Sequence, residues 1–180
     1  GDCSHYFEKD NIDLKPSFPI HFGNNVINKR VGKKESTQIL LKYGIKKPFI
    51  LSVGTIEARK NHETLYYAWL KMLEKAKDET IPQLVIVGYP GWLTKDFLRI
   101  VKNDERVKGI IIFVTLTDNE LDVLYRNCLF TVLSSLYEGW SLTLPQSLGY
   151  GKFCITSDVK PFHEIGGKLI DYVRQYDING

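Results

Sequence analysis

Five short, nearly continuous apolar runs recur along the chain, and this pattern restricts the fold more than any other feature of the sequence. The runs are PFILSV, QLVIVG, GIIIFV, LFTVL and KFCIT, at positions 48–53, 83–88, 109–114, 129–133 and 152–156. Each run is bounded by turn residues and does not alternate between apolar and polar positions. This pattern is typical of strands that are buried on both faces of a sheet.

Stretches with helical spacing separate these runs. The clearest is NHETLYYAWLKMLEKAK at positions 61–77, where an apolar stripe predicts an amphipathic helix. Its members are Leu65, Trp69, Met72, Leu73 and Ala76. The stretch TDNELDVLYRN opens with Thr117 and Glu120, spaced as a capping box. The stretch KKESTQILLKYGI predicts a short helix that Gly44 closes.

Strand and helix therefore alternate at least four times, which predicts a doubly wound parallel α/β sheet of Rossmann-like type with helices on both faces. The segment FPIHFGNNVINK at 18–29 is a candidate early strand, and KLIDYV at 168–173 is a candidate late one. A length of 180 residues fits a single domain spanning 1–180. In such folds, ligands bind beyond the carboxyl ends of the strands.

Composition excludes several classes of protein. A formal net charge of +3, with scattered Lys and Arg, argues against a nucleic-acid partner. The three cysteines have no disulfide or zinc spacing, so we expect reduced thiols in the cytoplasm, with Cys128 and Cys154 buried. Without a long apolar stretch or a signal-peptide pattern, the chain is expected to be soluble. It starts at Gly1 and ends without a helix cap, which favours one half of a longer polypeptide.

Basic residues follow the first run, in GTIEARKNHE at 54–63. Gly54 permits a turn, and Asn61 is expected to cap the following helix. Arg59 and Lys60 would then stand beside the free amides and positive dipole end of that helix, which together favour an anion such as a diphosphate. A solvated Arg-Lys pair on a surface loop explains the same pattern equally well.

An isolated acid follows the fourth run, in SSLYEGWSLTLPQSLGYGKF at 134–153. Glu138 precedes a predicted helix that holds Pro145 in its first turn. The alternative role for Glu138 is a surface acid that compensates the helix dipole. Of the other strand ends, YPGW predicts a tight loop with Trp92 packed on the sheet edge, and TLT at 115–117 offers amides to a planar base.

Several motifs are absent from the sequence. It has no GxGxxG, GxxxxGK[ST] or GxSxG motif, and no Asp-x-Asp pair or histidine cluster for a metal. His62 and His163 are expected to be isolated surface or capping residues. The pattern favours binding of a diphosphate without a metal and without any cofactor.

Four segments together resemble a known family: VGTIEARKNHETL, GYPGW, DNELDVLYRNC and SLYEGWSLTLPQSLGYGKFCITSDVKPFHEIGG. They are similar to the carboxy-terminal half of retaining glycosyltransferases of the GT-B fold, the group 1 or family-four type, over residues 49–170. In that family two Rossmann-like domains face each other. The carboxy-terminal domain holds the nucleotide-sugar donor and the amino-terminal domain holds the acceptor.

By this resemblance, Arg59 and Lys60 grip the diphosphate and Glu138 hydrogen-bonds the transferred sugar, which makes these three the candidate catalytic residues. The loop 115–117 meets the base, and amides over 139–142 support the sugar and the phosphate. The candidate substrate-binding residues are Gly54, Thr55, Thr115, Leu116, Thr117, Gly139, Trp140, Ser141, Leu142 and Gln146.

The sequence departs from the family pattern at Gln146, where the family has a second acid that binds the ribose hydroxyls. It also carries Ser141 where the family usually has glycine. The first departure puts the donor affinity in doubt and leaves open a non-catalytic nucleotide-sugar-binding or scaffolding domain. A dinucleotide-binding oxidoreductase domain is the other alternative, although the glycine fingerprint that it needs is missing.

The resemblance implies metal-independent sugar transfer with retention of configuration, and likeness to mannosyl- and rhamnosyltransferases of surface polysaccharide assembly favours GDP-mannose as the donor. The implied partners are a nucleotide-diphosphate sugar and a glycan or lipid-linked acceptor. The acceptor would be held by an amino-terminal domain that this chain lacks, so the chain alone is expected to bind donor and transfer little. We expect a cytoplasmic location, with peripheral contact at the inner face of the membrane left open.

Overall fold

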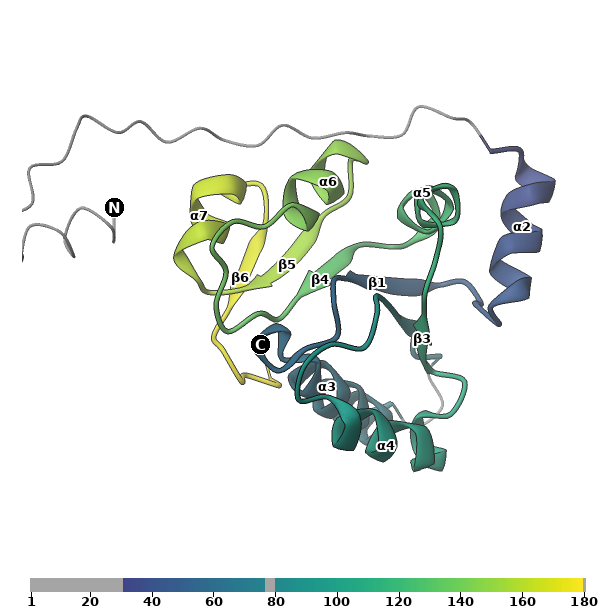
Figure 1. Cartoon of the computed structure of the whole chain (residues 1–180), viewed down its shortest axis with the longest axis horizontal. Helices are drawn as coiled ribbons and strands as arrows, with labels where there is room; N and C mark the ends of the chain where they lie inside the picture. Colours follow the sequence, from purple (N-terminus) through teal and green to yellow (C-terminus); the bar gives the residue numbers. More distant parts are fainter. Residues whose placement is uncertain (1–30, 77–79, 180) are drawn as a thin grey trace, which may run out of the picture.

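A computed structural model describes residues 31–76 and 80–179 of the chain. The candidate early strand at 18–29 and Cys3 lie outside the described residues. The described part is a layered α/β structure in which helices cover both faces of a central sheet (Figure 1).

The sheet has six strands in the order β3-β2-β1-β4-β5-β6, and every adjacent pair is parallel. The strands are β1 (Phe49–Val53), β2 (Gln83–Val87), β3 (Ile111–Val114), β4 (Thr131–Leu133), β5 (Cys154–Ser157) and β6 (Asp171–Val173). The five predicted strands and the late strand at 168–173 are therefore confirmed. Several begin one to three residues later than the apolar runs.

Six α-helices are described. They are α2 (Lys33–Lys42), α3 (His62–Lys75), α4 (Lys95–Asn103), α5 (Asp118–Asn127), α6 (Thr143–Gly149) and α7 (Lys160–Gly166). In Figure 1, α3 and α4 lie below the sheet, and α5, α6 and α7 lie above it. Two short 3-10 turns, Ala58–Lys60 and Glu105–Val107, precede α3 and β3. The predicted doubly wound arrangement is confirmed.

Alternate residues of β1 feed two cores on opposite faces of the sheet. Phe49 and Leu51 pack against α2 and α5, and Ile50 packs against α3 and α4. A third cluster joins β4 and β5 to α6 and α7 around Phe162. The continuous apolar runs are explained by this burial on both sides. Cys128 and Cys154 are buried free thiols, as predicted.

Helix ends agree with the sequence at three places and disagree at a fourth. Thr117 and Glu120 form the predicted capping box of α5, Gly44 ends α2 with φ +67°, and Pro145 lies in the first turn of α6. The predicted side-chain cap of α3 is wrong, because Asn61 makes no capping hydrogen bond. Asn61 has a left-handed backbone with φ 51° rather than the extended backbone from which a cap residue reaches the first turn.

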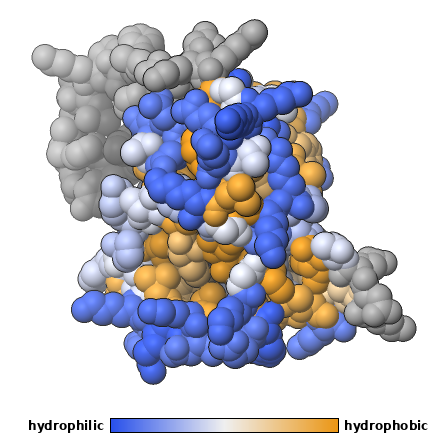
Figure 2. All heavy atoms as spheres, turned by 90° about the vertical axis from the view of Figure 1, so that its right-hand side faces the viewer, coloured by the Kyte–Doolittle hydropathy of each residue, from blue (hydrophilic) through white to orange (hydrophobic). Residues whose placement is uncertain are grey.

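Figure 2 views the molecule from the side on which α2 and the edge strand β3 lie in Figure 1, and a band of apolar residues there lies between hydrophilic residues above and below. The prediction that Trp92 packs on the sheet edge is wrong, because Trp92 is 78% exposed in the loop after β2.

Candidate functional site

An ion cluster lies at the topological switch point of the sheet, between the carboxyl ends of the adjacent strands β1 and β4. Lys60 Nζ lies 2.5 Å from Glu138 Oε1, and Arg59 Nη1 lies 2.9 Å from Glu138 Oε2. Arg59 Nε also contacts Glu57 Oε1 at 2.7 Å. The side chain of Glu138 is only 4% exposed, that of Lys60 is 15% exposed and that of Arg59 is 46% exposed. Two basic and two acidic groups therefore neutralise one another in one place.

The alternative roles are wrong for Lys60 and for Glu138, whereas the side chain of Arg59 is 46% exposed, as expected for a loop residue. Lys60 is not a solvated loop residue, and Glu138 is not a surface acid, because their charged atoms meet inside the protein. Both cations after β1 contact the same carboxylate, and their predicted binding of a diphosphate stays a prediction. The sequence did not indicate that the acid after β4 would be their partner, because the two segments are more than seventy residues apart.

Serine hydroxyls tie the loop after β1 to the loop after β4. Ser135 Oγ donates to Glu138 Oε1 at 2.7 Å, and Ser134 Oγ donates to the carbonyls of Lys60 and Asn61 at 2.8 and 3.0 Å. Ser157, at the end of β5, donates in turn to the carbonyl of Ser135. Ser134, Ser135 and Ser157 were not among the candidate residues predicted from the sequence. The sequence feature that could have indicated Ser134 and Ser135 is that two adjacent serines directly follow the apolar run at 129–133.

Glycines bring the strand ends into close contact. Gly54 has φ +150°, and the side chain of Lys60 runs over it, with Cε 3.5 Å from where a Cβ would lie. A Cβ on Gly88, at the end of β2, would lie 2.0 Å from the carbonyl oxygen of Gly54. Gly54 therefore provides both the predicted turn and the space for Lys60. Thr55 follows it and lies against Gly91 in the loop after β2.

The loop after β3 borders a cavity of about 490 Å³ that is also lined by Tyr89. Thr115 Oγ1 donates to the carbonyl of Gly88 at 3.3 Å, which connects this loop to the glycines beside Lys60. Leu116 and Thr117 line the same cavity. The amide and hydroxyl of Thr117 are both bonded to Glu120 Oε2 at 2.9 Å, so its polar groups serve the cap of α5.

Glu120 is held in place by basic and hydroxyl groups as well as by the cap. Lys42 Nζ and the Tyr43 hydroxyl donate to Glu120 Oε1 at 2.7 and 2.9 Å. The bond from Lys42, followed by the bond from the Thr117 amide, lowers the pKa of Glu120 to about 2. The cavity beside the loop 115–117 thus contains an ionised carboxylate whose oxygens are already hydrogen-bonded.

The remaining candidate site residues lie in the segment between Glu138 and α6 and on α6 itself. Glu138 and Gly139 line a cavity of about 370 Å³ together with Lys160 and Glu164 of α7, two residues that sequence analysis did not single out. Ser141 is buried, and its hydroxyl contacts the Leu144 amide and Thr143 Oγ1. Trp140 is half-buried and Leu142 is 61% exposed.

Gln146 lies on α6 and is half-buried. Its Oε1 accepts a hydrogen bond from the Tyr125 hydroxyl at 3.3 Å. Burial raises the pKa of Tyr125, so the phenol keeps its proton and acts as a donor. The position therefore has an acceptor oxygen that a carboxylate would also provide.

The two histidines differ from expectation. His62, the first residue of α3, is only 5% exposed and therefore not on the surface. His163 is exposed but not isolated, since Nε2 lies 2.6 Å from Asp158 Oδ1 and the ring stacks on Tyr172. Burial, helped by the charge of Lys60, lowers the pKa of His62 to about 4.

We expect this histidine to make stability depend on pH. The unfolded chain takes up the proton near pH 6.5 and the folded chain only near pH 4, so stability is complete above pH 6.5 and falls as pH drops towards 4. The loss amounts to about 3 kcal/mol. Urea unfolding of wild type and His62→Gln at pH 7, 6, 5 and 4 measures it. The variant should lose this dependence, and equal slopes in both proteins would contradict the assignment.

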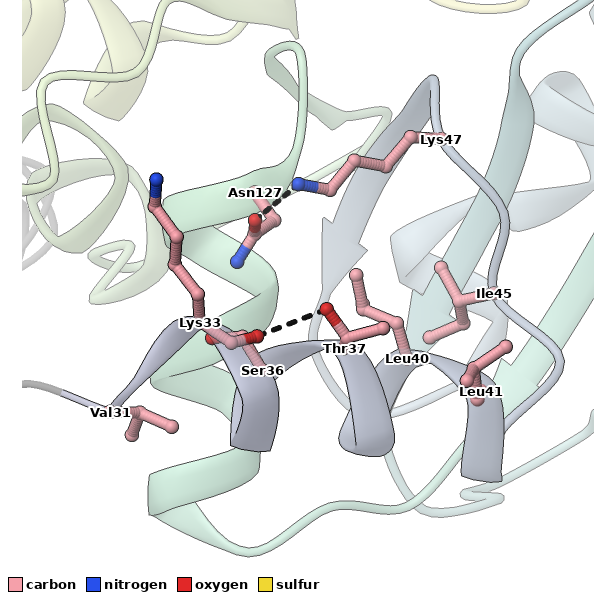
Figure 3. Close-up of a pocket in the computed structure, with 9 residues that line it drawn as sticks. All are labelled: Val31, Lys33, Ser36, Thr37, Leu40, Leu41, Ile45, Lys47 and Asn127. Atoms are coloured by element: carbon pink, nitrogen blue, oxygen red, sulfur yellow. Dashed lines mark hydrogen bonds between the residues drawn. The ribbon is translucent and has the colours of Figure 1, made fainter.

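A separate pocket of about 470 Å³ lies at the opposite end of β1 (Figure 3). It is lined by α2 residues such as Lys33 and Thr37, and by Lys47 and Asn127. Lys47 Nζ contacts Asn127 Oδ1 at 2.5 Å, and the Thr37 hydroxyl donates to the Lys33 carbonyl. The first of these bonds joins two segments of the lining and the second lies within α2, and the pocket lies away from the predicted ligand edge. We assign it no ligand.

Over residues 31–76 and 80–179, no three His, Cys, Asp or Glu side chains gather as metal ligands would. The helices of this same part of the chain are too short or too polar to cross a membrane.

Comparison with known proteins identifies the family. The profile of the family "Glycosyl transferases group 1" matches residues 34–170. The chain belongs to this family of glycosyltransferases. The match contains every candidate site residue, from Gly54 to Gln146.

Two curated relatives of this glycosyltransferase chain come from Escherichia coli. The serotype-specific mannosyltransferase WbdA is 29% identical over 127 residues, which are 70% of this chain and 16% of that protein. The O-antigen chain mannosyltransferase B is 28% identical over 134 residues, which are 74% of this chain and 35% of that protein. The chain thus spans about a sixth to a third of the length of these relatives.

Solved structures agree with the fold. The crystal structure of the pneumococcal O-GlcNAc transferase GtfA, in complex with UDP and GlcNAc, superposes with a TM-score of 0.66 at 16% identity. The match covers 97% of this chain and 33% of that one. At this identity the likeness establishes the Rossmann-like GT-B architecture.

Proposed function

We propose that this glycosyltransferase chain is a nucleotide-sugar-binding domain that serves retaining, metal-independent sugar transfer. The observation that most supports the proposal is the ion cluster of Arg59, Lys60 and Glu138 at the switch point of the sheet. Ligands of open parallel sheets bind at this point. The cluster offers two cations for a diphosphate and a carboxylate for a sugar hydroxyl.

The proposed chemistry depends on charge. When the bond between the anomeric carbon and the phosphate oxygen breaks, negative charge grows on the leaving diphosphate. Lys60 and Arg59 stabilise that charge, and their positions are set in advance by Glu138 and by the serine bonds to the loop after β1. The two cations take the part that a divalent metal plays in other transferases.

GDP-mannose is the donor that we propose, because both E. coli relatives are named mannosyltransferases. The name of the O-antigen relative supports a polysaccharide acceptor or a glycolipid. We propose that an amino-terminal domain outside this chain holds the acceptor, so that this chain alone transfers little sugar. Action in the cytoplasm, at the inner face of the membrane, is part of the same proposal.

A thermal-shift screen tests the function. The 180-residue chain is heated with UDP, GDP, ADP and dTDP and with their sugar conjugates, since a ligand of the folded state raises the melting temperature. The best ligand is then titrated by calorimetry with and without a chelator. We expect GDP-mannose to bind equally in both conditions. Loss of binding with the chelator would contradict metal independence, and no binding of any nucleotide would contradict the function.

A binding or scaffolding domain without catalysis is the second candidate, and Gln146 is the observation that favours it. An amide offers one acceptor oxygen where a carboxylate would accept from both ribose hydroxyls. An activity assay of the complete polypeptide separates the two candidates.

We expect Gln146→Glu to tighten nucleotide binding by about 1 kcal/mol, after the cost of placing a charge at this half-buried position. The new carboxylate can keep the hydrogen bond from Tyr125. Titration of wild type and variant at matched pH and salt measures the change, with Gln146→Ala as the control that removes the acceptor. Unchanged or weaker binding in Gln146→Glu would mean that this position does not meet the ribose.

A further inference from the structure

The groups proposed to hold the diphosphate are already occupied by a protein anion. Lys60 Nζ and Arg59 Nη1 each donate to a different oxygen of Glu138. Arg59 Nε is engaged by Glu57. The side chain of Glu138 is 4% exposed, so the carboxylate has little water to replace these partners. The charges of Lys60 and Arg59 are therefore already neutralised by acidic side chains of the same protein.

A diphosphate therefore meets an obstacle at this site. To bond Lys60 and Arg59 it must take over hydrogen bonds that Glu138 now receives. It then lies close to a buried carboxylate of the same sign, and like charges a few ångströms apart inside a protein repel strongly. Among the residues that the structure describes, Ser135, at 2.7 Å, would remain as the hydrogen-bond donor to Glu138 Oε1.

We propose that Glu138 is a built-in competitor of the diphosphate, and that it makes the site select the complete nucleotide-sugar over the bare nucleoside diphosphate. The inference rests on the proposed function. When the phosphates bind Lys60 and Arg59, the carboxylate of Glu138 loses hydrogen-bond donors. A hydroxyl of the sugar donates to Glu138 and replaces a lost donor. A bare nucleoside diphosphate brings no such donor and leaves the buried carboxylate under-bonded.

The same exchange gives a route for product release. Once the sugar has moved to the acceptor, the hydroxyl donor leaves Glu138. The carboxylate then returns to Lys60 and Arg59 and displaces the diphosphate from them. Glu138 thus acts as a specificity-determining residue for donor against product.

Glu138→Gln tests the inference, because it removes the charge and keeps the size of the side chain. The ligands are the nucleotide-sugar that binds wild type best in the screen and its nucleoside diphosphate. We expect the nucleoside diphosphate to bind Glu138→Gln roughly three- to tenfold more tightly than wild type. The nucleotide-sugar should bind Glu138→Gln no more tightly than it binds wild type. The ratio of the two dissociation constants is the readout. A nucleoside diphosphate that binds Glu138→Gln equally or more weakly would overturn the inference.

Two further variants support the interpretation. Glu138→Ala removes the charge without placing an amide N–H against Arg59, so it repeats the test if Glu138→Gln does not fold. Glu105→Gln removes one negative charge from a side chain that is 77% exposed just before β3, at the amino edge of the sheet, and should leave both affinities unchanged.

The outcomes separate this inference from the proposed function. If wild type binds no nucleotide, the function fails. If wild type binds nucleotides but neither Glu138 variant tightens the nucleoside diphosphate, the function stands and the competition is refuted. Equal tightening of both ligands would show that Glu138 repels phosphate without recognising the sugar, which also refutes selection.

Discussion

Lys60→Ala is expected to lower the free energy of unfolding by about 2–3 kcal/mol, because it leaves the buried carboxylate of Glu138 with one cation instead of two. The loss is below the ~3–5 kcal/mol of a fully unpaired buried charge, since Arg59 and Ser135 still contact Glu138. Nucleoside diphosphate affinity should fall about tenfold or more with the loss of a charged donor. Urea unfolding and calorimetric titration measure the two effects.

The double variant Lys60→Ala/Glu138→Gln is the matched control. It removes the charge that Lys60→Ala leaves unpaired, so part of the lost stability should return, while the diphosphate affinity should stay below that of the Glu138→Gln single variant, which keeps Lys60. A double-mutant cycle gives the coupling between the two side chains. If the two destabilisations simply add, the side chains do not depend on each other. Arg59→Ala should lower diphosphate affinity about tenfold as well, with a smaller effect on stability because Arg59 is 46% exposed.

Gly88→Ala is expected to destabilise the domain by about 3 kcal/mol, the upper end of the usual cost of overpacking, because the new methyl group meets backbone rather than a movable side chain. The Cβ would lie 2.0 Å from the Gly54 oxygen, so the turn after β1 must shift. That shift displaces the side chain of Lys60, which runs over Gly54, and should also abolish tight nucleotide binding.

Gly32→Ala is the control for Gly88→Ala. Gly32 precedes α2, and a Cβ there meets nothing within 4 Å. Its replacement should cost less than about 1 kcal/mol, the usual scale of a poorer helix cap, and leave binding unchanged. Thermal unfolding and titration compare both variants with wild type. A stable, nucleotide-binding Gly88→Ala protein would show that the strand ends can separate without harm.

The sequence alone determined the strands, most of the helices and the edge of the sheet at which the candidate site residues gather. Apolar runs such as the one that became β2 can satisfy their side chains only in a sheet covered on both faces, and the sequence encodes that directly. Local hydrogen bonding likewise encodes the cap at Thr117 and the end of α2 at Gly44. Candidate residues could be chosen because parallel strands point their carboxyl ends to one edge.

Tertiary structure decided what those residues do to one another. The ion pairs of Glu138 with Arg59 and Lys60 join loops that no local pattern connects, and only the adjacency of β1 and β4 brings them together. The sequence wrongly predicted an exposed His62 and a packed Trp92, because exposure also depends on segments that are distant in the sequence. A side chain's exposure depends on what distant segments place over it. Charge pairing and burial act through space, whereas periodicity and capping act along the chain.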